Sequence, residues 1–281
     1  MALTSTTSNA YVLRDTYELP AEINVEKFKA AWDAVARSNH ILRTRVVFVK
    51  GLGSCQVVIA EQIAWQHSND LDDYLSKDRS ESMDYGTRLA RFAIVDNGKG
   101  KKTFVWTVHH ALYDGYSMGL VFAAVDLAYQ NNLGVFPTRP FVDFIRYLDQ
   151  IDKETVTRFW ADQLKDLETS SFPLPPAGHL CQADNTVSYS VPFSIDRASG
   201  ITMATLLKAA WSILVSRLSE SLDVVYGVTQ SGRDLDLPDI EMINGPTITT
   251  VSPFWYVEAL LVSNLLIGPH ENQGRGADSS P

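Results

Sequence analysis

The chain has 281 residues, 45% of them hydrophobic and 20% charged, so it is long enough to bury one large core or the cores of two lobes. Its 33 acidic and 24 basic residues give a net charge of −9, which argues against nucleic acid as the main partner because phosphate binding needs a basic surface. The same charge is unfavourable for binding an anionic membrane.

The cysteine content and the N-terminal segment favour a cytoplasmic protein. Cys55 and Cys181 are too few and too far apart for a disulfide framework or a metal site. Residues 1–10 lack the positive start and apolar core of a signal peptide, and no run approaches the roughly 20 apolar residues of a spanning helix. We therefore expect no membrane segment.

The first part of the chain predicts alternating strands and helices. Residues 11–19 are typical of a strand, and Asn24 is a suitable N-cap for a helix that ends near Asn39. Strands at 42–49 and 55–60 follow. Further predicted elements are a helix at 70–77, a hairpin of strands at 88–95 and 103–108, and helices at 118–129, 141–148 and 154–167, the last capped by Asp152.

The pattern restarts after a proline-rich segment. Three prolines between Ser170 and Gly178 make this segment the clearest linker in the chain. Beyond it the sequence predicts a strand at 186–193, a helix at 202–218 and a strand at 223–229. Two α/β units joined by a linker are the simplest arrangement.

The predicted strand at 103–108 leads directly into HHALYDG at residues 109–115. Histidine is well suited to proton transfer near neutral pH, so His109 and His110 are candidates for a general base in acyl transfer. A metal site is disfavoured, because adjacent histidines on a strand point to opposite faces and no nearby cysteine or third histidine completes a ligand set. Hydrogen-bonded core histidines are the third interpretation, and the residues alone leave the choice open.

Two residues that follow the pair can shape the loop. Asp114, four residues after His110, can buttress it. Gly115 permits a backbone conformation that other residues resist.

Four segments resemble sequence motifs of the nonribosomal peptide synthetase condensation domain and occur in the same order as in that family, which is a branch of the chloramphenicol acetyltransferase-like superfamily. HHALYDG at 109–115 resembles the signature HHxxxDG, and residues 39–45 are similar to the upstream HxxLRT segment. DVVYGVTQSGR at 223–233 and GPTITTV at 245–251 resemble the two later blocks. The resemblance covers about residues 11–251, and the form of the motif, HHALYDGYS, resembles that of fungal members.

This resemblance implies an α/β fold made of two α+β lobes, with the first lobe nearly complete and the second truncated. The expected parts are an N-terminal condensation lobe at 1–168, a Pro-rich linker at 169–180, a partial C-terminal lobe at 181–252 and a divergent, partly disordered tail at 253–281.

Two departures from the family pattern are expected to matter. The helix that precedes the first strand is missing, and residues 252–256 replace an expected strand of the second lobe. We therefore expect one helix of that lobe to have poorly covered apolar residues, which would favour association or instability. These residues are Leu206, Ala210, Ile213 and Val215.

The resemblance also implies roles for individual residues. His110 would act as general base on the acceptor amine, or position that amine and stabilise the tetrahedral intermediate. His109 and Asp114 look structural in the family, and Asp114 is expected to form an ion pair with Arg233. Gly115 would offer its backbone N–H as an oxyanion-type contact.

Several other residues have less specific interpretations. Arg43 and Arg45 are more typical of solvated strand residues or structural ion pairs than of catalysis. Arg233 could alternatively be a solvated loop charge. Trp106 and Tyr113 could line a substrate tunnel, but aromatic residues beside a buried strand are more often core residues.

The implied activity is amide formation between a donor thioester and an acceptor amine, each on the phosphopantetheine arm of a peptidyl carrier domain, with no cofactor bound directly. Other synthetase modules are possible partners, whereas nucleic acid and membranes are not expected. The alternatives are an inactive remnant or carrier-docking module, and a cyclising, epimerising or standalone acyltransferase. Retention of His109 favours ordinary condensation over cyclisation.

Overall fold

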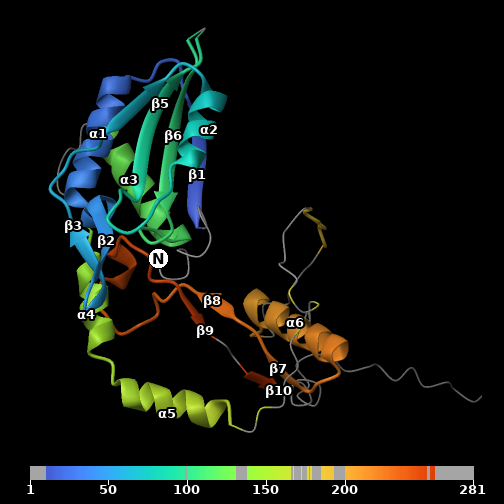
Figure 1. Cartoon of the computed structure of the whole chain (residues 1–281). Helices are drawn as coiled ribbons and strands as arrows, with labels where there is room; N and C mark the ends of the chain where they lie inside the picture. The colour runs from blue at the N-terminus through green and yellow to red at the C-terminus, as the bar shows by residue number, and fades with distance from the viewer. Residues whose placement is uncertain are drawn as a thin grey trace, which may run out of the picture. The chain divides into compact units, whose positions relative to one another are not determined.

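The computed structural model describes residues 11–98, 100–130, 138–165, 185–192, 200–251 and 254–256, together with residues 167, 172, 176 and 178 (Figure 1). These residues belong to two compact units. The first comprises residues up to 151 and 230–249, and the second comprises residues 152–229 and those from 250 onward. The lobe boundaries drawn from the sequence stay predictions, but the sequence did not indicate that residues 230–249 return to the first unit.

The first unit is built on a four-stranded sheet with the order β1-β6-β5-β4. The strands are β1 (Val12–Leu19), β4 (Trp65–Ser68), β5 (Ala90–Asp96) and β6 (Lys102–His109). β6 pairs antiparallel with both β1 and β5, while the edge strand β4 runs parallel to β5. The strands predicted at 11–19, 88–95 and 103–108 are confirmed as β1, β5 and β6. β4 was not predicted, because its four residues are too few to show a periodic pattern.

Helices cover both faces of this sheet. α1 (Val25–Ser38) and α3 (Gly115–Tyr129) lie on one face and α2 (Leu71–Ser80) on the other (Figure 1). Trp32 of α1 and Trp106 of β6 are fully buried in the core between the sheet and the helices α1 and α3. Because Asn24 caps α1 by accepting the backbone N–H of Lys27, the predicted start of that helix is confirmed.

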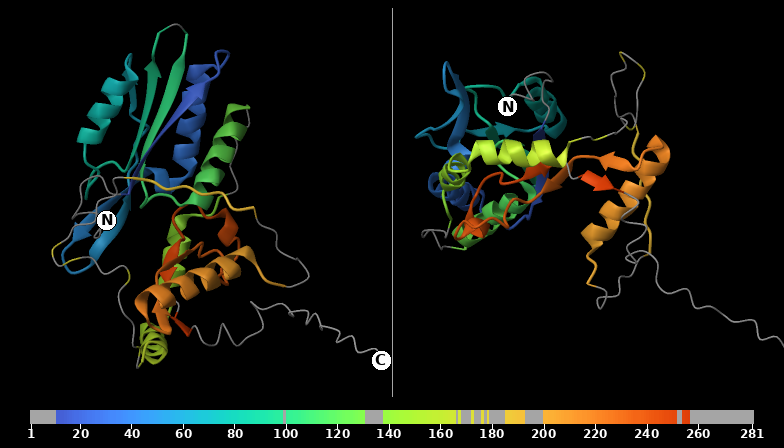
Figure 2. Two further views of the ribbon diagram at one scale, coloured as in Figure 1. Left: turned by 90° about the vertical axis from the view of Figure 1, so that its right-hand side faces the viewer. Right: turned by 90° about the horizontal axis from the view of Figure 1, so that it is seen from below.

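The remaining elements of the first unit lie outside the sheet. A 3₁₀ turn, η1 (His40–Arg43), replaces the first residues of the predicted strand at 42–49. β2 (Thr44–Val49) and β3 (Gly53–Val58) then pair as a separate two-stranded ribbon, seen in Figure 2. The other elements are α4 (Phe141–Asp149) and the short 3₁₀ helix η3 (Ile240–Met242).

The two arginines of this region have structural contacts. Arg43 donates hydrogen bonds to the carbonyls of Ala36 and Ile59, and Arg45 forms an ion pair with Glu61 at 3.0 Å. Neither side chain reaches the histidine pair, in agreement with their non-catalytic interpretation.

The second unit contains α5 (Lys153–Gln163), capped by Asp152, and α6 (Met203–Ser219). The predicted strand at 223–229 is interrupted and forms β7 (Asp223–Val225) and β8 (Val228–Gln230). β8 pairs with β9 (Thr249–Val251), and β10 (Phe254–Tyr256) pairs antiparallel with β7. A short strand therefore does follow residue 251, where the sequence indicated a departure from the family.

The strand predicted at 186–193 is wrong for its described residues. Residues 185–192 adopt no regular structure, and Val187 and Tyr189 are 92% and 89% exposed. Their alternation of apolar and polar residues is typical of a strand, but a strand also requires a neighbour for its hydrogen bonds. The predicted linker at 169–180, apart from residues 172, 176 and 178, and the end of the tail at 271–281 lie outside the described residues.

The exposed face of α6 differs from the predicted one. Val215 is 7% exposed because it packs against Val224 of β7, while Leu206 and Ile213 are half-buried. Of the four residues expected to be poorly covered, Ala210 alone is exposed. The large apolar side chains that are exposed at helical spacing on α6 are Met203, Leu207, Trp211, Leu214 and Leu218.

A buried carboxylate fastens α2 to the sheet. Asp78, whose side chain is 1% exposed, accepts hydrogen bonds from Arg14 Nε of β1 at 2.7 Å and from Arg91 Nε of β5 at 2.6 Å. The hydroxyl of Thr107 on β6 donates a third bond to it at 3.0 Å. One residue of α2 is thereby bonded to three strands.

We expect Asp78→Ala to lower the free energy of unfolding by about 3–5 kcal/mol, because two arginines would lose a buried partner. Asp73→Ala, an exposed position on the same helix, should cost less than about 1 kcal/mol. Chemical denaturation of both variants gives the comparison. Equal stabilities would show that the buried network contributes little.

Candidate active site

The first histidine of the pair is a buried, neutral group. His109 ends β6, is 2% exposed and accepts the backbone N–H of Ala111 on Nδ1 at 3.0 Å. Its proton therefore lies on Nε2, which is buried and has no partner within the described part of the chain. Burial lowers the pKa of His109 from 6.5 to about 4, so the ring is uncharged at neutral pH.

The second histidine lies just beyond the strand and is half-buried. The backbone N–H of His110 donates to the carbonyl of Tyr11 at 2.8 Å, which extends the pairing of β1 with β6 by one step. Its ring stacks on Tyr113, with centroids 4.7 Å apart and planes inclined by 19°. Among the described residues no side chain or backbone group forms a hydrogen bond with its ring nitrogens.

Asp114 is the anchor of the loop between β6 and α3. It is fully buried and forms a capping box, in which Asp114 Oδ1 accepts the N–H of Ser117 at 2.7 Å and Ser117 Oγ accepts the N–H of Asp114 at 2.9 Å. Thr247 donates its backbone N–H to Asp114 Oδ2 at 2.9 Å. The carboxylate therefore holds both the start of α3 and a segment 133 residues away.

Arg233 completes the surroundings of this carboxylate. Its Nη2 lies 3.3 Å from Asp114 Oδ1 and donates to the carbonyl of Gly245 at 3.2 Å. Its Nη1 donates to the carbonyls of Ile240 and Ile243. Because the side chain is 6% exposed, Arg233 is not a solvated loop charge.

The charge state of Asp114 follows from these contacts. Burial by itself would raise the pKa of the carboxyl, but hydrogen bonds from Ser117 and Thr247 and the charge of Arg233 outweigh it, so the net pKa is lowered. Asp114 is therefore an anion at neutral pH, and the ion pair is rigid because both partners also bond to the backbone.

Two glycines bring the later sequence blocks close to Asp114. Gly232 has φ +63°, and a Cβ there would lie 2.0 Å from the carbonyl oxygen of Thr247. Gly245 has φ +145°, and a Cβ there would overlap the ring of Phe141 at 2.3 Å. A side chain at position 232 would therefore move the backbone of Thr247, and one at position 245 would move the ring of Phe141.

Sequence reasoning missed several residues that support the site. Ser117 could have been found from the Asp-x-x-Ser spacing, which is typical of a capping box. Thr247 lies inside the block at 245–251, but nothing in the sequence indicates its partner. The same holds for Asn39 and Asn244, whose buried amides bond at 2.7 Å across 205 residues.

The backbone of Gly115 does not have the unusual conformation that the sequence suggested for this glycine. It is the first residue of α3, its φ is not positive, and an added Cβ would meet no atom within 4 Å. It is also exposed, and a residue at this helix position has no intrahelical acceptor for its N–H. The backbone conformation therefore does not require glycine, and the N–H belongs to an exposed residue.

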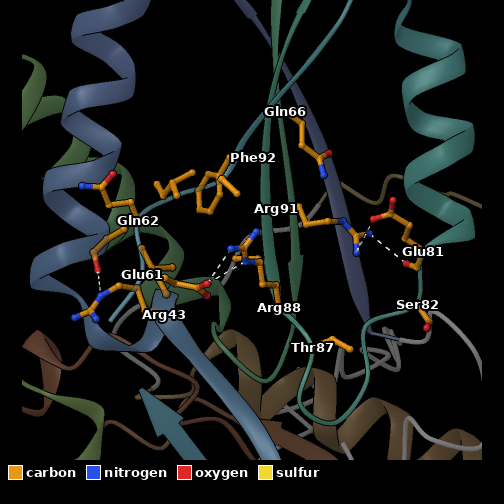
Figure 3. Close-up of a pocket in the computed structure, with 15 residues that line it drawn as sticks. Arg43, Glu61, Gln62, Gln66, Glu81, Ser82, Thr87, Arg88, Arg91 and Phe92 are labelled. Carbon is orange, nitrogen blue, oxygen red and sulfur yellow. Dashed lines mark hydrogen bonds and ion pairs between the residues drawn. The ribbon is translucent and has the colours of Figure 1, made fainter. Parts of the chain in front are cut away.

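A separate cleft of about 220 Å³ lies at the start of β5 (Figure 3). Its charged lining is largely paired internally: Arg88 binds Glu61 at 2.9 Å, and Arg91 bonds to Asp78 and to the carbonyl of Glu81. No residue of HHALYDG lines this cleft, so it is not the pocket of the histidine pair.

Within the described ranges, no group of three or more His, Cys, Asp or Glu residues is arranged to hold a metal ion. No helix among those residues is both long enough and apolar enough to cross a membrane.

Comparison with known proteins places these features in a family. The family model described as "Condensation domain" matches residues 1–258. The nonribosomal peptide synthetase atnA of Emericella nidulans is 42% identical over 255 residues, which make up 89% of this chain and 3% of that protein. Nonribosomal peptide synthetase 1 of Ajellomyces capsulatus is 38% identical over 286 residues, covering 98% of this chain and 16% of that protein.

Solved structures share the fold. The epimerization domain from the third module of tyrocidine synthetase B matches with a TM-score of 0.70 at 16% identity, over 88% of this chain and 64% of that chain. The X-domain from teicoplanin biosynthesis matches with a TM-score of 0.66 at 21% identity, over 90% and 62%. The predicted fold class is confirmed, and the chain spans less than two thirds of either solved chain.

We expect His109→Gln to flatten the pH dependence of stability. Because the pKa of His109 is about 4 when folded and about 6.5 when unfolded, only the unfolded chain takes up this proton between those values, and stability falls by about 3 kcal/mol as pH decreases through that range. Glutamine is a polar side chain of similar length that does not titrate. Denaturation at about pH 7 and about pH 4.5 measures the difference, and an unchanged decline in the variant would contradict it.

Proposed function

Because the chain belongs to the condensation-domain family, we propose that it contributes the catalytic motif of a fungal peptide synthetase, forming an amide from a carrier-bound thioester and a carrier-bound amine. The observation that carries this proposal is the His110 ring, which is half-buried, directly follows β6 and has no hydrogen bond to its nitrogens from the residues that the structure describes. A histidine kept only for packing would be expected to bond through at least one nitrogen.

In the proposed reaction the amine nitrogen attacks the thioester carbonyl, the new C–N bond forms and the C–S bond breaks. The nitrogen loses a proton and the departing thiolate of the donor arm gains one. His110 accepts or holds the amine proton during attack, the role for which an imidazole is suited near neutral pH. His109 cannot share this role, because it is buried and its accepting nitrogen is occupied by Ala111.

Gly115 supplies the second element of the proposed chemistry. Its N–H lies at the N-terminus of α3, where the helix dipole favours negative charge. An N–H in this position is suited to the oxyanion that develops as the carbonyl is attacked. Asp114 does not take part directly; it positions both groups, because it caps α3 and immobilises the loop that follows His110.

The substrates and partners are inferred from the family. Donor and acceptor would be attached to phosphopantetheine arms of peptidyl carrier domains, which bring them to the motif from two directions. No direct cofactor is part of the proposal. The competing function, a remnant or docking module without turnover, predicts carrier binding but no dependence on His110.

We expect His110→Ala to reduce dipeptide formation between two loaded carrier proteins by about 10²- to 10⁴-fold, the usual contribution of a general acid–base group. His67→Ala, which removes an exposed histidine of β4, should leave the rate unchanged. Product is quantified by mass spectrometry after release from the carrier. Equal rates for the parent chain and His110→Ala would reject His110 as the base, and absence of product from a folded parent chain would favour the remnant.

Gly115→Ala should separate catalysis from folding. Its thermal stability should be unchanged or slightly higher, because an added Cβ meets no atom and alanine favours a helix. The condensation rate should fall roughly tenfold or more, since the methyl group obstructs approach to the N–H. Gly119→Ala on the same helix, where a Cβ also meets no atom, is the matched control. Unchanged activity in both variants would argue against the oxyanion contact.

A further inference from the structure

Tyr113 links the half-buried histidine to the hydrophobic core. Its ring faces His110 at a centroid distance of 4.7 Å, with the planes 19° apart. It also contacts Trp106, at 6.4 Å and 45°, and Trp106 is fully buried against Trp32 at 5.3 Å. Tyr113 itself is 8% exposed, so the surface on which His110 rests is held by the core.

The contact depends on the aromatic ring rather than on the hydroxyl. No hydrogen bond from the Tyr113 hydroxyl is found within the described residues. Burial raises the pKa of the phenol and the charge of Asp15 raises it further, so the ring stays neutral. The property of Tyr113 that reaches His110 is therefore a flat, uncharged face.

The orientation of His110 has few other determinants. Its backbone is fixed by the hydrogen bond to the carbonyl of Tyr11, but that bond does not restrict rotation of the side chain. The Tyr11 ring is 6.5 Å away, edge-on and 59% exposed. No hydrogen bond from the described part of the chain holds the imidazole nitrogens, and of the two described ring contacts of His110 the stack on Tyr113 is the closer.

We propose that Tyr113 is a positioning residue: by stacking on His110 it fixes the plane of the imidazole and so aims a ring nitrogen at the acceptor amine. The inference rests on the proposed function of His110 and adds a specific requirement for an aromatic ring at position 113. General-base catalysis depends on such alignment, because small misplacements of a reacting group reduce the rate strongly.

The test compares Tyr113→Phe, which keeps the flat ring, with Tyr113→Leu, which keeps an apolar side chain without one. We expect Tyr113→Phe to retain the rate, and Tyr113→Leu to lose about two- to tenfold in kcat with KM for the carrier substrates unchanged. Phe28→Leu is the control, because Phe28 packs against the same core and contacts Trp32 at 6.4 Å, but has no described ring contact with Trp106 or Tyr113. It should lower stability without changing kcat.

A second measurement reports the stack without requiring activity. An aromatic ring face shifts the proton signals of a group above it upfield, so the ring protons of His110 should be shifted in the parent chain and in Tyr113→Phe and return to ordinary positions in Tyr113→Leu. Proton–carbon NMR with labelled histidine resolves these signals, and the signal missing from His110→Ala identifies them.

The outcomes separate this inference from the proposed function. Positioning is supported if Tyr113→Leu loses the upfield shift and has a lower kcat while Tyr113→Phe and the control variant keep both. Full kcat in Tyr113→Leu, or a parent chain without the shift, overturns it. If neither the parent chain nor any variant makes product, the proposed function fails for this chain. The NMR shift then decides the contact by itself: an upfield shift in the parent chain that Tyr113→Leu abolishes supports the stack, and its absence from the parent chain overturns it.

Discussion

The arrangement of the motif depends on one buried negative charge. Removing a carboxylate from water costs several kcal/mol, and Asp114 is fully buried, so its site must replace the lost hydration in full. It does so with the backbone N–H groups of Ser117 and Thr247 and with the guanidinium of Arg233. These donors come from the helix that follows the motif and from the segment at 230–249, so the folding of that segment against the first unit and the ionisation of Asp114 depend on each other.

This constraint explains why motifs far apart in the sequence occur together. The motif that contains Arg233 and the motif that begins at Gly245 are not independent sites, because both form the socket of the Asp114 carboxylate. The segment that begins at Asn39 joins the same assembly through the amide of Asn244. Gly232 and Gly245 permit this convergence, since a Cβ at either position would occupy space that a neighbour already fills. Mutations in any of these segments should therefore affect the loop that holds His110.

The two histidines illustrate how adjacent residues acquire different chemistry. His109 is the last residue of β6 and its side chain is enclosed, so burial suppresses its charge and one nitrogen is bonded within the loop. His110 lies past the end of the strand, where its ring leaves the core and stacks on Tyr113. One step along a strand reverses the direction of the side chain, which assigns one ring to the interior and the other to the solvent-accessible side.

The sequence by itself determined the local features of this protein. The caps at Asn24 and Asp152 mark the starts of their helices, and HHALYDG identifies the histidine motif, because each depends on residues a few positions apart. The order of the four motifs was sufficient to predict the family and its fold class. The strand expected at 186–193 failed because alternation does not supply a pairing partner, and β4 was missed because its four residues are too few to show a periodic pattern. Only the tertiary structure decided that Thr247 and Arg233 both bind Asp114, and how His110 rests on a ring held by the core. The first two contacts join residues more than a hundred positions apart, and the third depends on side-chain packing around Trp106, so no local pattern of residues encodes them.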